Sequence, residues 1–376
     1  MKNDYLIVRT LRKVEFTVFC VDADQKQYYD KQFGVKLPYS SGQQTKRSIM
    51  ESILNVLNLR HAPIVYNFEV NKDKLEQKEI TQPCDPTYTD QLIGGWMSTP
   101  AKKGGKNDGD DEVVETTDKN AYKRRSPFSI SAMTAVHPLL ASLVNESKMT
   151  FDRTDSNDEI MVVRDSKGKE MNEDAIKAFL EKSNSKLTKR KLIQGKDRAN
   201  GFFKLDVAID LRKLFRVPIL LHDMEMSEDT TKKLKSEGWT EINDNLGTWL
   251  ELPKKYHVQF AEAIAWGIVN WKITSNQSRT YDAMPVLSVA ISHRADEIPN
   301  VIRGEIDEID GKIRGKLVVD TNYPNTKVYS TNLLKGYLKD AETSYTAIDD
   351  AVNHIKNAIL DYYGSNDKSS GDLELI

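Results

Sequence analysis

Residues 38–48, Pro-Tyr-Ser-Ser-Gly-Gln-Gln-Thr-Lys-Arg-Ser, stand between two segments of different periodicity. Before them, residues 5–20 partly alternate β-branched and aromatic side chains with polar ones, which predicts a long strand or a bent strand pair. After them, apolar residues recur at i, i+4 and i+8, which predicts an amphipathic helix over 42–58. The members of that apolar stripe are Ile49, Ile53 and Leu57. A strand followed by an amphipathic helix favours a domain that mixes both element types.

The start of this helix also has the features of an anion site. Ser40 or Ser41 can cap the helix, and Gly42 lets another backbone approach closely. Lys46 and Arg47 lie one turn further in, where cations oppose the helix dipole. Free amides, the positive end of the dipole and two cations together attract a phosphate. The alternative is an ordinary capped helix with solvated cations.

The rest of the chain alternates between strand-like and helical segments. Strands are predicted over 61–70, 159–164, 201–210 and 284–293, and helices over 172–182, 256–271 and 342–363. This order, with one long insertion, predicts an α+β fold with a ferredoxin-like or RRM-like sheet. We therefore expect a single domain over residues 1–376, carrying a flexible loop at 98–125, an insertion at about 145–200 and a C-terminal hairpin and helix at 300–376.

Composition limits the class of protein. The chain has 376 residues and a net charge of −2, from 54 Lys and Arg against 56 Asp and Glu, so a basic surface can only be local. Cys20 and Cys84 are the only cysteines, which excludes a disulfide scaffold and favours a reduced cytoplasm. The six histidines lack metal-binding spacing, and no cofactor motif is present, so we predict neither a metal nor a cofactor. Without a bilayer-length apolar run or a signal peptide, we expect a cytoplasmic protein with no membrane contact.

A glycine pair forms a second candidate site. Gly94 and Gly95 precede Trp96 and Met97, and such a loop can let a phosphate or a base approach the backbone. The alternative is an ordinary turn before a buried tryptophan.

Two basic segments form further candidates. Lys123, Arg124 and Arg125 end the polar insertion and can contact phosphates that order them on binding. The basic stretch 186–198 fits a mobile finger over a nucleic acid. Solvated surface charge is the alternative in both cases.

Four segments, in this order, resemble one protein family. They are residues 38–47 after the long first strand, Ile93-Gly94-Gly95-Trp96-Met97, Arg124-Arg125-Ser126-Pro127-Phe128-Ser129-Ile130-Ser131-Ala132, and residues 202–211 with 281–286. The chain resembles the CRISPR-associated backbone subunits that form the crRNA-binding filament of Cascade-type complexes, the DevR-like branch of the repeat-associated RRM-fold superfamily. The resemblance spans about residues 5–295, and the order of the segments carries it.

The resemblance implies an RRM-like palm with a protruding thumb, which either residues 145–200 or residues 98–125 would supply. Copies stack along one crRNA, and each copy holds a short run of nucleotides by the backbone. Transferred by position, the crRNA contacts are Ser41, Gly42, Gln43, Lys46, Arg47, Gly94, Gly95, Trp96, Met97, Arg124 and Arg125. Holding phosphate and sugar suits a subunit that must accept any guide sequence.

The resemblance further implies a non-catalytic subunit of a type I interference complex that supports pairing of the guide with target DNA. Its partners would be crRNA, target nucleic acid, further copies of itself and other Cascade subunits. RNA-cleaving type III relatives place a catalytic Asp in the loop before the capped helix, where this chain has Asp22 and Asp24. Cleavage of bound target RNA through Asp24 is therefore the enzymatic alternative, and a stand-alone RNA-binding module is the third hypothesis.

Overall fold

The computed structural model describes residues 3–19, 25–71, 74–98, 122–145, 148–151, 162–185, 187, 191–194, 197–219, 224–273 and 281–365. Contacts divide the chain into a larger unit, Met1–Leu143 with Ala199–Ile376, and a smaller unit, Val144–Arg198. Within the described ranges, no helix is both long and apolar enough to cross a bilayer.

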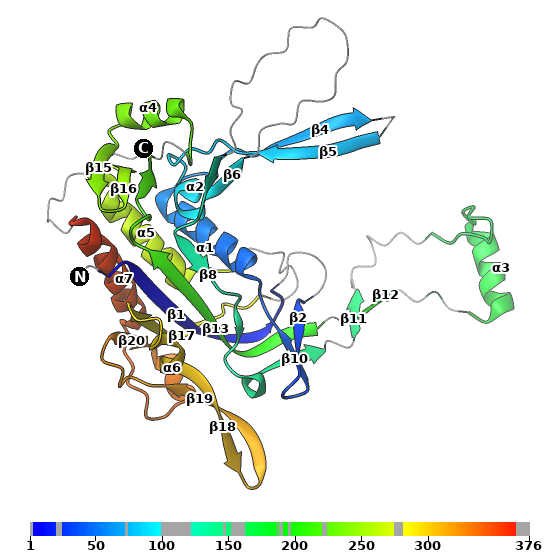
Figure 1. Cartoon of the computed structure of the whole chain (residues 1–376). Helices are drawn as coiled ribbons and strands as arrows, with labels where there is room; N and C mark the ends of the chain where they lie inside the picture. Colours follow the sequence, from blue (N-terminus) through cyan, green and yellow to red (C-terminus); the bar gives the residue numbers. More distant parts are fainter. Residues whose placement is uncertain are drawn as a thin grey trace, which may run out of the picture. The chain divides into compact units, whose positions relative to one another are not determined.

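One long strand, β1 (Tyr5–Thr17), is the centre of the main sheet (Figure 1). It pairs antiparallel with β13 (Asp197–Asp210) on one side and with β17 (Val286–Ser292) on the other. Val8 of β1 therefore lies opposite both Val207 and Ile291. Outward from these, β13 pairs with β8 (Phe128–Ile130) and β9 (Thr134–Ala135), and β17 pairs with β20 (Thr326–Ser330).

Helices connect these strands in the order of a split βαβ unit. α1 (Gly42–Leu57) follows β1, and α5 (His257–Asn270) connects β13 to β17. The first strand thus lies between the two strands that α5 joins, as in a ferredoxin-like sheet. The predicted α+β fold is confirmed.

The helix-covered face of the sheet carries the main core. Leu6, Val8 and Val14 of β1 are buried in one cluster with Ile49 and Ile53 of α1. α5 packs against both α1 and α7 (Ala347–Tyr363). The apolar stripe predicted at i, i+4 and i+8 is therefore the buried face of α1.

The opposite face of the sheet has its own cover. Leu11 of β1 is fully buried in a second cluster with Ile298 of α6 (Ile298–Val301) and Leu317 of β19 (Lys312–Val319). RRM domains use this face to stack bases on aromatic side chains. Here the C-terminal segment covers it around Leu11, so we look for a nucleic-acid site elsewhere.

Arg9 ties this cover to the sheet. Its Nε and Nη2 atoms donate to the two carboxylate oxygens of Asp206 at 2.6 and 2.7 Å, and its Nη1 donates to the Ile302 carbonyl at 2.9 Å. A bidentate, nearly buried pair of this kind holds one fixed geometry.

Short antiparallel ribbons and helices surround the sheet. They are β2 (Gln27–Asp30) with β3 (Val35–Pro38), β4 (Val65–Asn71) with β5 (Lys74–Thr81), β6 (Trp96–Ser98) with β7 (Tyr122–Arg124), β18 (Ile302–Ile309) with β19, the sheet β14 (Arg216–Pro218), β16 (Gly247–Glu251) and β15 (Thr240–Asp244), the strand β10 (Ala141–Asn145), and the helices α2 (Thr89–Gly94) and α4 (Glu228–Ser236). The strand predicted over 61–70 is β4, which belongs to a hairpin and not to the main sheet.

The smaller unit contains a two-stranded ribbon and a helix. β11 (Lys148–Phe151) pairs with β12 (Lys191–Gln194), and α3 (Glu173–Ser183) confirms the helix predicted over 172–182. The Asn172 side chain caps this helix by accepting from the Ala175 amide at 2.9 Å. Use of residues 145–200 as a thumb stays a prediction. Residues 99–121, most of the other candidate, lie outside the described residues.

His257, at the start of α5, makes stability depend on pH. It is fully buried, its Nε2 lies 2.8 Å from the Leu252 carbonyl, and its Nδ1 lies 2.8 Å from the Ser365 hydroxyl. Burial lowers the pKa of His257, because the neutral ring is favoured there. A depressed folded-state pKa gives stability that is complete above the unfolded value, about 6.5, and is lost as pH falls through it.

We therefore expect the melting temperature of the wild type to fall between pH 7.5 and pH 5.5 by more than that of a His257→Gln variant (pH values chosen about one unit on either side of 6.5). Glutamine can still donate to the Leu252 carbonyl but cannot titrate. Equal falls in the two proteins, measured by thermal unfolding, would contradict this role.

Candidate nucleic-acid interface

Ser41 stands at the N-cap position of α1 but does not cap it. Its backbone is extended (φ −68°, ψ 151°), and its side chain accepts no hydrogen bond from the first turn. Instead, Lys26 Nζ donates to the Ser41 hydroxyl at 3.4 Å. Ser40 is also no cap, since its backbone N–H and C=O both pair with Met133 at 3.0 Å. The predicted serine cap is therefore wrong, and the first turn carries no acidic side chain.

Gly42 is required by a close approach within the protein itself. An ideal Cβ at this position would lie 2.9 Å from the Ile130 carbonyl oxygen of β8. The backbone that approaches Gly42 is therefore that of β8, which fixes the start of α1 against the main sheet.

Lys46 also has a partner inside the protein. Its Nζ donates to the Gly94 carbonyl, the last residue of α2, at 2.8 Å. Burial lowers the pKa of Lys46. The cation thus holds the carboxyl end of α2 beside the start of α1, and it complements the negative end of the α2 dipole.

Gly95 packs against the segment that follows β7. Its φ is +76°, and an ideal Cβ would lie 2.5 Å from the Arg124 carbonyl and 2.7 Å from the Ser126 amide nitrogen. Ser126 in turn donates its hydroxyl to the Ile93 carbonyl at 2.8 Å. The glycine pair therefore serves a close contact between two protein segments.

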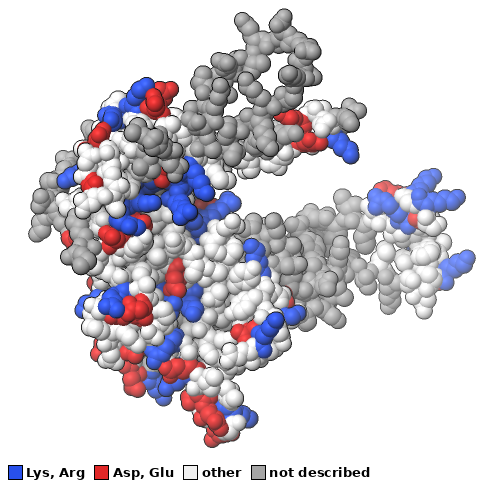
Figure 2. All heavy atoms as spheres, in the orientation of Figure 1, with Lys and Arg blue, Asp and Glu red and all other residues white. Residues whose placement is uncertain are grey.

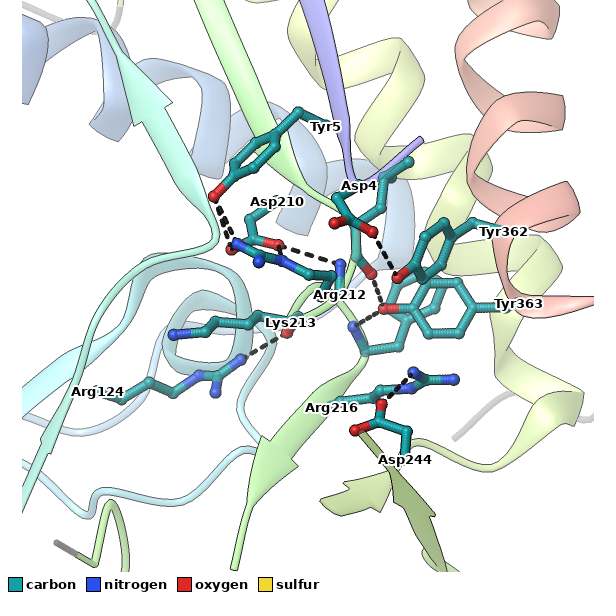
Figure 3. A network of polar contacts seen from close by, with 12 residues as sticks. Asp4, Tyr5, Arg124, Asp210, Arg212, Lys213, Arg216, Asp244, Tyr362 and Tyr363 are labelled. Atoms are coloured by element: carbon teal, nitrogen blue, oxygen red, sulfur yellow. Dashed lines mark hydrogen bonds and ion pairs between the residues drawn. The ribbon is translucent and has the colours of Figure 1, made fainter. Parts of the chain in front are cut away.

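Trp96 and Arg124 are corrections to the predicted RNA contacts. Trp96 is 4% exposed and donates its Nε1 to the Glu225 carbonyl. The Arg124 side chain is fully buried and pairs with the Glu225 carboxylate at 3.0 Å, and Figure 3 shows it reaching the Lys213 carbonyl. Burial lowers the pKa of Arg124, and Glu225 opposes that shift. Neither side chain can reach a phosphate at the surface.

Several predicted contacts are exposed and surround these buried ones. Arg47 is 71% exposed at its side chain and pairs with Glu51 at 2.9 Å. Met97 is 62% exposed and lies opposite Lys123 in the β6–β7 ribbon. The other exposed members are Gln43, Lys123 and Arg125.

Three segments far apart in the sequence thus meet around Gly94 and Gly95. They are the start of α1, the end of α2, and the stretch Arg124–Ser126. Lys and Arg side chains gather on the face that Figure 2 shows, over the place where α2 and β6 lie in Figure 1. We call the exposed cations Arg47, Lys123 and Arg125 the basic rim of this junction.

No part of this junction is arranged for metal chemistry. Among the described residues, no group of three or more His, Cys, Asp or Glu side chains could hold an ion. Asp22 and Asp24, the candidates for RNA cleavage, lie outside the described residues. Sequence reasoning missed Glu225, which pairs with Arg124, because a lone acid in a polar segment has no signal of its own.

No family model and no curated protein matches the sequence. Two solved structures are similar to it. A chain of a "CRISPR RNA-guided surveillance complex" has a TM-score of 0.39 and 10% identity, covering 93% of this chain and 99% of that chain. A chain of a "CRISPR RNA-guided surveillance complex, pre-nicking" has a TM-score of 0.40 and 8% identity, covering 99% of this chain and 94% of that chain. At these scores we base no functional argument on either structure.

Proposed function

We propose that the chain is a non-catalytic, crRNA-binding backbone subunit of a CRISPR interference complex. In this proposal, copies stack along one guide RNA in a type I complex, and the junction at Gly94 and Gly95 holds the RNA backbone. The observation that carries the proposal is the convergence of three sequence-distant segments with the exposed basic rim around them.

The chemistry of the junction suits phosphate better than base edges. The start of α1 carries no acidic side chain in its first turn, and no side chain caps it, so its amides face an anion without competition from a carboxylate. Arg47 and Arg125 add exposed charge beside it. Such contacts are independent of base sequence, as a guide-holding subunit requires.

The basic rim is tested best without Lys46, since removing Lys46 would also release α2 from α1. We expect the double variant Arg47→Ala, Arg125→Ala to bind single-stranded RNA more weakly for every sequence tried. The slope of log K against log salt should fall by about 1.4 in magnitude, because two phosphate contacts are lost at about 0.7 each. Filter binding over a salt series measures both quantities.

The matched control is Lys232→Ala, Arg294→Ala, which removes the same charge from other exposed positions, 73% and 55% exposed at their side chains. It should keep the wild-type slope. If both double variants have the same slope, general charge and not the junction attracts RNA, and the site assignment fails. If the number of copies bound does not rise with RNA length, the stacking proposal fails.

A further inference from the structure

A groove of about 560 Å³ lies between α1 and α5, on the outer side of the helix pair. Ser48 and Asn55 of α1 line one wall, and Trp266 and Asn270 of α5 line the other. The walls belong to rigid elements. At Gly267 the two helices come so close that an ideal Cβ would lie 2.4 Å from Ile53 Cγ1.

Two buried polar groups in this groove lack partners. Ser48 is 1% exposed, and within the described part of the chain its hydroxyl makes no hydrogen bond. The Nδ2 atom of Asn270 is likewise buried without an acceptor among the described residues. Native proteins rarely leave such groups unsatisfied, since each costs about 1–3 kcal/mol. A ligand that offers hydrogen-bonding groups would remove this cost.

Trp266 adds a flat apolar surface to the same groove. It is 41% exposed, although the rest of α5 is mostly buried. An aromatic platform beside an amide and a hydroxyl matches a planar ligand with polar edges. An unpaired nucleobase has this combination, because its face stacks on tryptophan and its edge accepts from an amide and a hydroxyl.

The groove continues from the basic rim. Arg47 directly precedes Ser48, and its partner Glu51 also lines the groove. A strand with a phosphate at Arg47 would therefore have a neighbouring base within reach of Trp266. A peptide of another chain would gain less here, since nothing in the groove is arranged to pair with an extended backbone.

We propose that the α1–α5 groove holds one unpaired RNA base, stacked on Trp266 and hydrogen-bonded by Ser48 and Asn270. This inference rests on the proposed function, since the base would belong to the strand held at the junction. The groove selects for an unstacked base and not for a particular sequence.

The test uses the full chain and a single-stranded RNA that carries one 2-aminopurine, whose fluorescence falls when it stacks. We expect strong quenching on binding to wild type, and a loss of most of it in Trp266→Ala with at least about fivefold weaker binding. Trp266→Phe should keep much of the quenching, because phenylalanine still stacks. The control Val258→Ala, an exposed position on α5 outside the groove, should match the wild type.

The outcomes separate this inference from the proposed function. If RNA binds and Trp266→Ala quenches as wild type does, no base occupies the groove and the inference is overturned. If no RNA binds at all, the proposed function fails. The groove is then tested alone with 2-aminopurine riboside 5′-monophosphate. Quenching that Trp266→Ala and Asn270→Ala each abolish supports a base site, and absence of quenching overturns it.

Discussion

Replacing Gly95 with alanine is expected to lower the free energy of unfolding by about 3 kcal/mol or more. Two effects combine. The backbone conformation at φ +76° costs an L side chain about 1–3 kcal/mol. The new Cβ would also overlap the Arg124 carbonyl and the Ser126 amide, at 2.5 and 2.7 Å, and overpacking of this kind costs about 1–3 kcal/mol. Backbone atoms cannot turn aside as a long side chain can.

The neighbouring Gly94 supplies a matched control. An ideal Cβ there meets only the flexible end of Met50, at 3.6 Å, and Gly94 is absent from the positive-φ positions. Gly94→Ala should therefore change stability by less than about 1 kcal/mol. Denaturant unfolding of both variants measures the difference. Equal effects of the two substitutions would show that the junction around Gly95 is looser than the contacts indicate.

This pair of glycines shows what the sequence could and could not predict. A Gly-Gly before an aromatic residue correctly indicates a close backbone approach at Gly95. It does not say which backbone approaches, and the partner is the protein's own Arg124–Ser126 segment, about thirty residues further along the chain. The same holds for Gly42, whose neighbour is β8. Local patterns carry conformational need, whereas the partner depends on tertiary pairing.

Cations illustrate the same limit. Lys46 and Arg47 are adjacent and look equivalent in sequence, yet one donates to Gly94 and the other is exposed. Successive residues of a helix point about 100° apart, so one faces α2 while the other does not. Periodicity predicted the buried stripe of α1 correctly, because Ile49 and Ile53 answer to the sheet below them. It had no means to locate α2.

The hairpins were harder still to predict. Strand pattern identified β4, but its alternation could not tell a sheet strand from a ribbon paired only with β5. The C-terminal hairpin was expected within 300–376, yet its contribution to the cover over Leu11 needed the register of β18 and β19. The base-stacking face of the sheet was thus open in the sequence and is covered there in the fold.

Replacing Arg124 with methionine is expected to cost about 3–5 kcal/mol of stability. Its guanidinium donates to the Leu92 carbonyl at 3.2 Å, to the Lys213 carbonyl at 2.8 Å and to Glu225 at 3.0 Å, and it lies 5.5 Å from the Trp96 ring (Figure 3). Methionine keeps much of the volume but none of the donors. Two buried carbonyls and a nearly buried carboxylate would lose these contacts, and breaking one side of a buried pair usually costs this much.

A double variant distinguishes the charge from the packing. If the cost comes mainly from the carboxylate left in a dry site, then Arg124→Met with Glu225→Met should be more stable than Arg124→Met alone, because two apolar groups need no counter-charge. Arg125→Met, an exposed neighbour, controls for the loss of an arginine and should be nearly neutral in thermal unfolding. A double variant no more stable than the single one would mean that the carbonyl contacts dominate. In either case Arg124 acts by holding the basic rim in place, so Arg124→Met should weaken RNA binding only in proportion to unfolding, whereas Arg125→Met weakens it while the fold stays intact.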